Sequence, residues 1–348
     1  MSRVVHIGNL KIGGDNPIRI KGMLKTPFAD KRGMMKEAKL LVDEGVDAIR
    51  VAVKRDEDVL MAGYLKKEIK VPIVADIHFH HKLALAAIEN GFDAIRLNPM
   101  NITDKRKIIQ IARAAKKAKV SMRVGVNSGG FKCSGSDDDK LAKLMVDEVA
   151  KFIDVLESEK YNAIMVSLKA STVNTTVLAN KLFAKRFDYP VHLGVTATGP
   201  FLGAVVKSSV GIGILLNEGI GDVIRVSLTA PSYQEIQVAK NILNSLGEYD
   251  IVPEIISCPT CSRCSVDLVS LVEKAQLAVS KLDKTSKNLP KKIAFMGCEV
   301  NGPGEAMQAD VGVAFGEAKG VLFKKGKIVG TVSKNSSVNE LLKKMGVK

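Results

Sequence analysis

The hexapeptide Gly45-Val-Asp-Ala-Ile-Arg50 recurs almost unchanged as Gly91-Phe-Asp-Ala-Ile-Arg96, and in a looser form as Gly219-Ile-Gly-Asp-Val-Ile-Arg225. In each copy a glycine follows a stretch with helical periodicity and precedes a short apolar run. Glycine at this place is typical of a helix C-terminus, because it accepts the left-handed backbone conformation that ends many helices. The three copies therefore indicate that helices and strands alternate along the chain.

The alternation extends well beyond these copies. Eight apolar runs have the length and composition of strands: Ile18–Met23, Ala48–Val53, Pro72–Ile77, Ala94–Asn98, Ser121–Asn127, Ala163–Lys169, Val191–Thr196 and Val223–Leu228. Helical patterns follow them: Met34–Glu44, Lys82–Glu89, Lys105–Lys119, Lys140–Glu157, Thr175–Arg186, Val205–Asn217 and Tyr233–Leu246. Strand–helix units in this number predict an α/β fold of the (β/α)8, TIM-like barrel type. An open doubly wound sheet is the alternative, and no Gly-x-Gly-x-x-Gly motif supports it.

Two domains are expected. The segment Val4–Ile12 predicts a small hairpin that caps one end of the barrel. The stretch Gly247–Pro253 marks a boundary, so that residues 1–250 form the barrel and residues 251–348 form a smaller α/β domain. For the second domain the sequence predicts a helix, two strands and a hairpin: Val266–Leu282, Lys292–Met296, Val311–Phe315 and Gly320–Val332.

The composition narrows the class of protein. Apolar residues make up 46% of the chain, and no apolar run reaches the length of a membrane span. The N-terminus lacks a signal-peptide pattern, and five clustered cysteines do not make a secreted disulfide framework, so we expect a cytoplasmic protein. The net charge of +15 favours an anionic partner, either a phosphorylated molecule or an acidic redox protein. Aromatic residues make up only 5% and no nucleic-acid-binding motif is present, so no nucleic-acid partner is expected.

Four of the five cysteines lie in two segments, Ser257-Cys-Pro-Thr-Cys-Ser-Arg-Cys264 and Gly297-Cys-Glu-Val-Asn-Gly-Pro-Gly-Glu305. A Cys-x-x-Cys pair with a distant third thiolate can hold a soft metal ion or an iron–sulfur cluster. The glycine-rich second segment favours a cluster, because its free backbone N–H groups can approach cluster sulfides. From the spacing alone, a redox dithiol, a zinc site and buried apolar cysteines stay open.

Five predicted barrel strands carry a cationic side chain: Arg50, Arg96, Arg123, Lys169 and Arg225. Barrel enzymes build their active sites at the C-terminal ends of the strands, and so many cations at one mouth require a polyanion. Guanidinium groups match phosphate oxygens in pairs, which indicates a phosphate or diphosphate ligand. Further polar side chains belong to the same predicted rim: Asp76, His78, Asn98, Asn127, Ser167, His192 and Ser227. The sequence thus predicts a pocket for a small, doubly phosphorylated substrate.

Longer motifs in these strands and loops match a known family. They are Val74-Ala-Asp-Ile-His-Phe79, Arg96-Leu-Asn-Pro99, Arg123-Val-Gly-Val-Asn127, Val166-Ser-Leu-Lys-Ala-Ser171, His192-Leu-Gly-Val-Thr196 and Glu218-Gly-Ile-Gly-Asp-Val-Ile-Arg-Val-Ser-Leu228. Together with the two cysteine segments, they make the chain resemble the IspG or GcpE family of 4-hydroxy-3-methylbut-2-enyl diphosphate synthases over essentially its whole length. The two cysteine segments together are the most specific part of the match.

The resemblance implies an iron–sulfur oxidoreductase. Its [4Fe–4S] cluster would be held by Cys258, Cys261, Cys298 and Glu305, and its electrons would come from flavodoxin or ferredoxin. The implied substrate is 2-C-methyl-D-erythritol 2,4-cyclodiphosphate, whose ring is opened and reduced with loss of water in the non-mevalonate route to isoprenoids. The resemblance also implies a homodimer. We assign substrate binding to Arg50, Arg96, Arg123, Lys169, Arg225, Ser227 and His192, and catalysis to Glu305, His78 and Asn127.

The chain departs from the family pattern at four places. Lys21-Gly-Met-Leu24 replaces the usual Gln-Ser-Met-Thr, and Thr196-Ala-Thr-Gly199 replaces Thr-Glu-Ala-Gly, which removes a carboxylate. Leu202 takes the place of a usual arginine, and Cys264 is an additional thiol. Two alternatives therefore stay open: a paralogous [4Fe–4S] reductase or dehydratase acting on another phosphorylated substrate, or a non-catalytic zinc- or anion-binding protein. The fifth cysteine, Cys133, lies in a predicted loop and is expected to be dispensable.

Overall fold

The computed structural model describes residues 1–131, 137–250, 253–280, 282, 289–336 and 338–347. The chain divides into two compact units, Met1–Tyr249 and Asp250–Lys348, and each unit has its own apolar core. No helix within these described ranges is long and apolar enough to cross a membrane. Cys133 lies outside the described residues.

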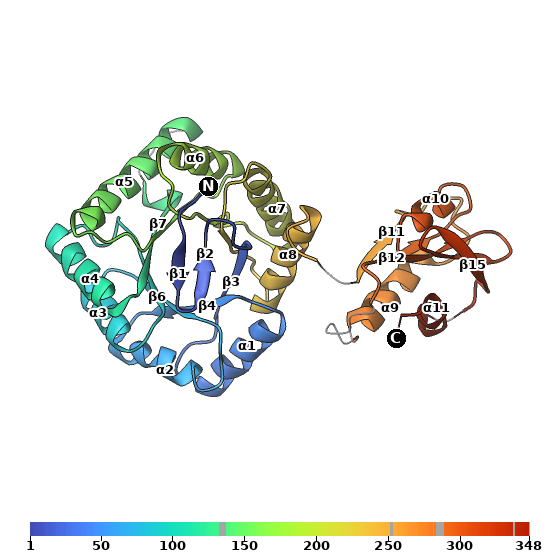
Figure 1. Cartoon of the computed structure of the whole chain (residues 1–348), viewed down its shortest axis with the longest axis horizontal. Helices are drawn as coiled ribbons and strands as arrows, with labels where there is room; N and C mark the ends of the chain where they lie inside the picture. Colours follow the sequence, from blue (N-terminus) through green and yellow to red (C-terminus); the bar gives the residue numbers. More distant parts are fainter. Residues whose placement is uncertain (132–136, 251–252, 281, 283–288, 337, 348) are drawn as a thin grey trace. The chain divides into compact units, whose positions relative to one another are not determined.

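The first unit is a nearly closed, eight-stranded parallel barrel surrounded by helices (Figure 1). Its strands lie in the order β8-β7-β6-β5-β4-β3-β10-β9, and a bridge between Val166 and Val191 joins β8 to the segment before β9. The strands are β3 (Arg19–Met23), β4 (Ala48–Val53), β5 (Ile73–Ile77), β6 (Ala94–Leu97), β7 (Ser121–Asn127), β8 (Ile164–Lys169), β9 (His192–Leu193) and β10 (Val223–Ile224). The predicted TIM-like barrel is confirmed.

The helices form the outer layer because each buries one apolar face against the strands. Side-chain caps begin four of them, α1, α4, α5 and α6. In the first two, Asp30 Oδ1 accepts the N–H of Gly33 and Asp104 Oδ1 accepts the N–H of Arg106, both at 2.9 Å. The α-helices are α1 (Lys31–Asp43), α2 (Met61–Leu65), α3 (His81–Glu89), α4 (Lys105–Ala118), α5 (Asp138–Ser158), α6 (Val173–Arg186), α7 (Phe201–Asn217) and α8 (Ser232–Ser245), and η1 (Asp56–Leu60) and η2 (Ser128–Gly130) are short 3-10 helices.

The N-terminal hairpin closes one end of the barrel, as the sequence predicts. It consists of β1 (Val5–Ile7) and β2 (Leu10–Ile12), which pair antiparallel. Ile7 and Ile12 are fully buried against an apolar layer made by residues from four different strands: Val74, Ala94, Met165 and Val223. These residues lie at or near the N-terminal ends of their strands, so the C-terminal end is left for the site.

Two strands are shorter than predicted. The sequence predicts strands over Val191–Thr196 and Val223–Leu228, whereas β9 and β10 contain two residues each. The backbone of Gly194 has φ +155°, and a Cβ atom there would lie 2.4 Å from Lys169 Nζ and 2.5 Å from the carbonyl oxygen of Arg225. The chain therefore leaves the regular strand at Gly194 because Lys169 and the backbone of Arg225 approach it too closely for a side chain.

The second unit is a five-stranded sheet in the order β11-β12-β13-β14-β15, covered by helices. Strands β11 to β13 are parallel, and β14 and β15 add an antiparallel hairpin. The elements are β11 (Glu254–Ser257), α9 (Leu268–Ser280), β12 (Lys292–Met296), α10 (Gly302–Met307), β13 (Val311–Phe315), β14 (Gly320–Lys324), β15 (Lys327–Val332) and α11 (Val338–Met345). The sequence analysis predicts β12, β13 and the hairpin closely but does not predict β11, α10 and α11.

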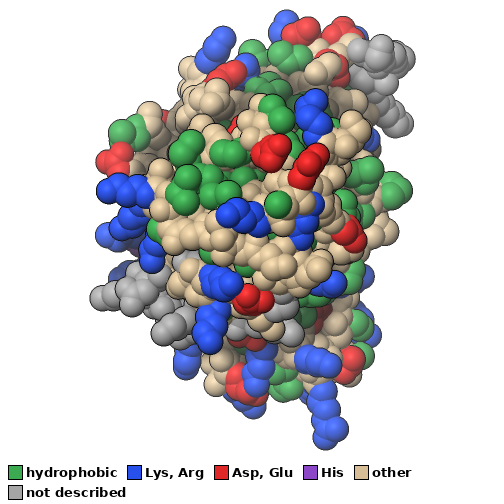
Figure 2. Space-filling model, turned by 90° about the vertical axis from the view of Figure 1, so that its right-hand side faces the viewer, with side chains coloured by type: hydrophobic (Ala, Val, Ile, Leu, Met, Phe, Trp, Pro, Cys, Tyr) green, Lys and Arg blue, Asp and Glu red, His purple; other side chains and the backbone are tan. Residues whose placement is uncertain are grey.

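Basic side chains are dispersed over the surface. Figure 2 shows one face, on which Lys and Arg side chains alternate with acidic and apolar ones. Such interspersed charge is typical of a solvated surface.

Candidate active site

Several of the predicted substrate ligands lie inside the barrel lumen. Arg96 on β6 is paired with Asp76 on β5 and with Arg123 on β7, so these three residues occupy adjacent positions around the barrel. Arg50 on β4 approaches the same carboxylate. All four residues are at most 9% exposed. Because alternate strand residues point into a barrel, the register collects these charges at one place.

Asp76 is the carboxylate at the centre of these arginines. Its oxygens lie 3.7 Å from Arg50 Nη1 and 3.3 Å from Arg96 Nη1, and 3.7 Å from His78 Nε2. Burial alone would raise the pKa of Asp76, but Arg50, the hydrogen bond to His78 and Arg96 hold it well below its usual value of 3.8. Asp76 is therefore ionised at neutral pH and aligns the two guanidinium groups.

We expect Asp76→Asn to destabilise the protein by about 3 kcal/mol at pH 7, because it leaves two buried arginines without their shared carboxylate. The pKa of Asp76 is lower in the folded protein than in the unfolded chain. Its charge therefore stabilises the fold fully above the pKa of the unfolded chain, and this stabilisation is lost as the pH falls through the pKa of the folded protein. The difference between variant and wild type should thus shrink below about pH 4 in urea unfolding. The exposed Asp154→Asn is the control, expected to change the free energy of unfolding by less than about 0.5 kcal/mol. An equal effect at pH 7 and at low pH would contradict this account.

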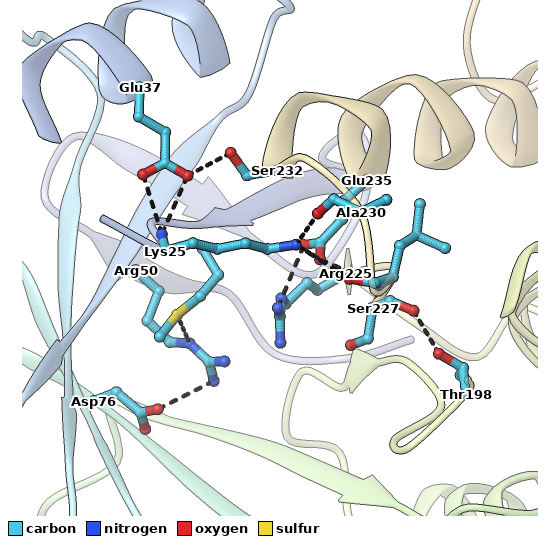
Figure 3. A network of polar contacts seen from close by, with 12 residues as sticks. Lys25, Glu37, Arg50, Asp76, Thr198, Arg225, Ser227, Ala230, Ser232 and Glu235 are labelled. Carbon is cyan, nitrogen blue, oxygen red and sulfur yellow. Dashed lines mark hydrogen bonds and ion pairs between the residues drawn. The ribbon is translucent and has the colours of Figure 1, made fainter. Parts of the chain in front are cut away.

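A second carboxylate, Glu235 in the first turn of α8, holds Arg225 (Figure 3). Glu235 is 2% exposed, and its oxygens lie 3.3 Å from Arg225 Nη2 and 3.0 Å from Lys25 Nζ. It also accepts the N–H of Leu228 at 3.1 Å. Glu235 therefore ties together the segments that follow β3 and β10 and fixes the guanidinium of Arg225. The sequence analysis missed it, although an acidic residue in the first turn of a helix directly after a barrel strand is a usable signal.

The lumen contains more cationic groups than these two carboxylates can pair. Burial, followed by the charges of Arg50 and Arg96, lowers the pKa of Arg123 well below its ordinary value. Burial and the charges of Arg123 and Arg225 do the same to Lys169. Among the described residues, several buried polar atoms here have no hydrogen-bond partner: Lys21 Nζ, Arg96 Nε, Arg123 Nε and Nη2, His192 Nδ1 and Nε2, and Arg225 Nε. An oxyanion with several acceptor atoms would satisfy such an arrangement.

The remaining predicted residues lie around this group. Asn127 and Lys169 are paired at the C-terminal ends of β7 and β8. His78 lies just beyond the end of β5 with 42% of its side chain exposed, and its Nε2 is 2.9 Å from Arg96 Nη1. His192 is fully buried. Ser227 is half-buried, and its carbonyl oxygen accepts a hydrogen bond from Thr198 Oγ1 at 2.5 Å.

The two cysteine segments meet at one edge of the second sheet. Ser257, the last residue of β11, is paired with Phe295 on β12, so Cys258 and Gly297 both follow the same ends of adjacent parallel strands. The N–H of Gly297 points to Cys258 Sγ at 3.4 Å, and the N–H of Ser265 donates to the carbonyl oxygen of Gly297 at 2.8 Å. The strand register thus brings the Cys-x-x-Cys loop against the loop that carries Cys298.

The loop after Cys298 favours a thiolate. Hydrogen bonds from the backbone N–H groups of Asn301 and Val300 lower the pKa of Cys298. Cys261 is exposed, and Glu305 is exposed on the single turn of α10. Three cysteine sulfurs and one carboxylate are donors that suit a soft iron–sulfur group, so the types of residue present fit such a cofactor.

The additional thiol, Cys264, is placed differently. Its Sγ donates to the carbonyl oxygen of Val266 at 3.2 Å. The side chain also packs against the apolar core of the second unit, as that of Cys258 does. A Cβ atom on Gly297 would lie 2.3 Å from the sulfur of Cys264, so the glycine makes room for it. Cys264 is therefore engaged as a thiol. In the part of the chain that the structure describes, no three His, Cys, Asp or Glu side chains are arranged around a single metal ion.

Comparison with known proteins decides the family. Residues 2–240 match the model of the GcpE TIM-barrel domain, and residues 254–346 match that of the GcpE protein C-terminal domain. The chain belongs to the GcpE family. Three relatives are named 4-hydroxy-3-methylbut-2-en-1-yl diphosphate synthase (flavodoxin). This chain is 42% identical to the one from Thermodesulfovibrio yellowstonii, 41% to the one from Malacoplasma penetrans and 39% to the one from Clostridium acetobutylicum. These matches cover at least 99% of this chain and at least 95% of each relative.

The fold of the GcpE barrel also resembles solved structures outside the family. Dihydropteroate synthase from Yersinia pestis has a TM-score of 0.53 at 12% identity, and the enzyme from Stenotrophomonas maltophilia has 0.52 at 14%. These matches cover 70% and 69% of this chain and 98% of each of those chains. At this identity the likeness concerns the barrel fold alone.

The departures from the GcpE pattern fall at distinct places in the barrel. Lys21 is 1% exposed on β3, inside the lumen. Ala197 has a left-handed backbone with φ +51° in the segment between β9 and α7. Leu202 is 75% exposed on α7. Lys21 therefore belongs to the buried cationic group of the barrel, whereas Leu202 lies on its outer surface.

Proposed function

We propose that this chain is a flavodoxin-dependent 4-hydroxy-3-methylbut-2-en-1-yl diphosphate synthase. The observation that carries the proposal is the full-length identity of 39–42% to relatives with that name, which includes both cysteine segments. We further propose 2-C-methyl-D-erythritol 2,4-cyclodiphosphate as the substrate. The excess of buried cations in the lumen supports this, because a diphosphate offers many acceptor oxygens to converging donors.

The barrel residues would bind and orient the substrate. Arg96 and Arg225 are held by Asp76 and Glu235, so their guanidinium groups are aligned before the diphosphate arrives. Arg123 and Lys169, both buried, would contribute further charge, with His192 beside them. At the mouth, His78 has a polar neighbour on each side of its ring: Arg96 Nη1 lies 2.9 Å from Nε2, and Asn101 Nδ2 lies 3.0 Å from Nδ1. In this proposal His78 moves a proton to the departing hydroxyl group, and Asn127 orients that hydroxyl group.

The proposed cofactor is a [4Fe–4S] cluster held by Cys258, Cys261, Cys298 and Glu305. Such a cluster supplies one-electron reduction and a Lewis acid when it is bound. The loop N–H groups that favour the thiolate of Cys298, and the exposed carboxylate of Glu305, support this ligand set. The need to keep such a cluster reduced supports a cytoplasmic location.

Turnover of the cyclic diphosphate tests this function. Anaerobic protein given reduced flavodoxin and the cyclic diphosphate should form 4-hydroxy-3-methylbut-2-enyl diphosphate, detected by mass spectrometry. The loss of a carboxylate at Ala197 favours one alternative, a paralogous [4Fe–4S] reductase or dehydratase for a different phosphorylated compound. That alternative predicts a brown, iron-containing protein that does not turn over the cyclic diphosphate.

We propose that the protein acts as a homodimer, with α7 in the contact. One face of α7 carries exposed apolar side chains at intervals of four residues: Leu202 75%, Val206 54%, Val210 46% and Ile214 40%. Residues four apart lie on the same side of a helix, so these form a continuous stripe. A groove of about 320 Å³ beside it is lined mainly by apolar side chains of α7 and α8, among them Phe201, Val205 and Ile242. An apolar stripe of this length is typical of a protein interface.

Val206→Glu is expected to weaken the dimer about 100-fold or more, because burial of an unpaired carboxylate costs about 3 kcal/mol. Sedimentation velocity over a range of concentrations measures the change. The control is Leu144→Glu on α5, an apolar residue away from α7 that is 39% exposed. A dimer that persists in Val206→Glu would exclude this face as the contact.

A further inference from the structure

A buried amine in the lumen has no role in the site as described so far. Lys21 on β3 is 1% exposed, and among the described residues its Nζ has no hydrogen-bond partner. Lys21 belongs to the segment Lys21-Gly-Met-Leu24, where the family resemblance described above leads us to expect Gln-Ser-Met-Thr. A buried lysine without a partner is rare in folded proteins and requires a physical reason.

The strand register places Lys21 at the floor of the anion site. Ile20 is paired with Ile224, so the next residues, Lys21 and Arg225, are neighbours on adjacent strands. On its other side Lys21 is paired with Ala48, whose small side chain fills little of the lumen. Val223 belongs to the apolar layer that the N-terminal hairpin covers, and Lys21 and Arg225 lie one level above it. Lys21 and Arg225 thus belong to the layer directly above the closed end of the barrel.

The charges that face Lys21 come from every neighbouring part of the barrel, and most of them are positive. They are Arg50 on β4, Asp76 on β5, Arg123 on β7, Lys169 on β8, His192 on β9 and Arg225 after β10. Asp76, the one carboxylate in this set, is paired with Arg50 and Arg96. Burial and the charges of Arg123 and Arg50 lower the pKa of Lys21 well below 10.5. Burial and the neighbouring cations thus disfavour the ammonium form while no anion is present, and an oxyanion in contact would favour it.

We propose that Lys21 is a further substrate-binding residue: its amine contacts a phosphate oxygen of the bound diphosphate from the floor of the lumen and takes up a proton as the anion binds. The inference deepens the proposed function, since it assumes a diphosphate in this lumen. Geometry carries it, because the unpaired Nζ shares the lumen with other unpaired donors of Arg123 and Arg225. The affinity for the diphosphate should therefore increase as the pH falls toward the pKa of Lys21 in the free protein.

Calorimetric titration with inorganic pyrophosphate tests the proposal. Titrations in two buffers of different ionisation enthalpy give the number of protons taken up on binding. Lys21→Gln should bind pyrophosphate about 10- to 100-fold more weakly, and the uptake of up to about one proton should be lost. Lys117→Gln, at an exposed position on α4, is the control and should match the wild type in both quantities.

Thermal unfolding separates a binding role from a structural one. Lys21→Met removes a buried, unpaired amine, so the ligand-free variant should melt at the same temperature as the wild type or higher. Wild-type affinity and proton uptake in Lys21→Gln would overturn the proposal, and so would a lower melting temperature of Lys21→Met. If the wild type turns over the cyclic diphosphate while Lys21→Gln binds pyrophosphate normally, only this inference fails. If pyrophosphate binding depends on Lys21 but no turnover occurs, the proposed function fails instead.

Discussion

Cys298→Ser is expected to reduce bound iron from about four atoms per chain to less than about one and to abolish turnover. Cys298 is the thiol whose pKa the N–H groups of Asn301 and Val300 lower, so the loop is built to hold a thiolate there. A serine hydroxyl at this position is a poor ligand for a soft cluster. The remaining thiols of Cys258 and Cys261 and the exposed carboxylate of Glu305 would be too few to retain it.

Iron analysis and the visible spectrum after anaerobic purification measure this effect. The matched control is Cys264→Ser, which should keep the iron and the spectrum because its thiol donates to the carbonyl oxygen of Val266. Glu305→Ala should alter the spectrum while much of the iron remains. Loss of iron in Cys264→Ser together with an unchanged Glu305→Ala would reverse the assignment of the fourth ligand.

Arg225→Ala and Arg96→Ala should each weaken diphosphate binding by about 1.5–3 kcal/mol, roughly 10- to 100-fold. Each variant removes a charge-assisted donor that a buried carboxylate has already aligned, Glu235 for Arg225 and Asp76 for Arg96. The iron content should not change, because the cluster ligands belong to the other compact unit.

Titration of each variant with the cyclic diphosphate measures the loss. Arg106→Ala is the control, since the side chain of Arg106 is 94% exposed on α4. Affinity equal to that of the wild type in both lumen variants would show that the diphosphate does not bind in the lumen.

The periodicity of the sequence was sufficient to predict the barrel because its strands are buried on both faces. Strands β4 and β7 begin and end at the predicted residues, as apolar runs bounded by turns are easy to recognise. Strands β9 and β10 are shorter because Gly194 is crowded by Lys169 and the backbone of Arg225. Such a contact joins segments far apart in sequence, and no local pattern contains it.

The sequence allowed many residues of the candidate site to be predicted, but not how their side chains contact one another. Arg50, Arg96 and Arg123 stand out as cations in apolar strands. Their proximity in space follows from the register of the parallel strands. Glu235 was missed because it reaches Arg225 from a helix. Sequence spacing could not separate Cys264 from the proposed ligands either, since its hydrogen bond to Val266 and its contact with Gly297 depend on the fold.

The ratio of electrons consumed to product formed tests the central claim most directly. Anaerobic wild-type protein would be given a limiting amount of reduced flavodoxin with excess 2-C-methyl-D-erythritol 2,4-cyclodiphosphate. Ring opening with loss of water requires about two electrons for each 4-hydroxy-3-methylbut-2-enyl diphosphate formed. We predict that ratio, with no product when flavodoxin is left out. Oxidation of flavodoxin without this product, or no oxidation by an iron-replete protein, would contradict the account.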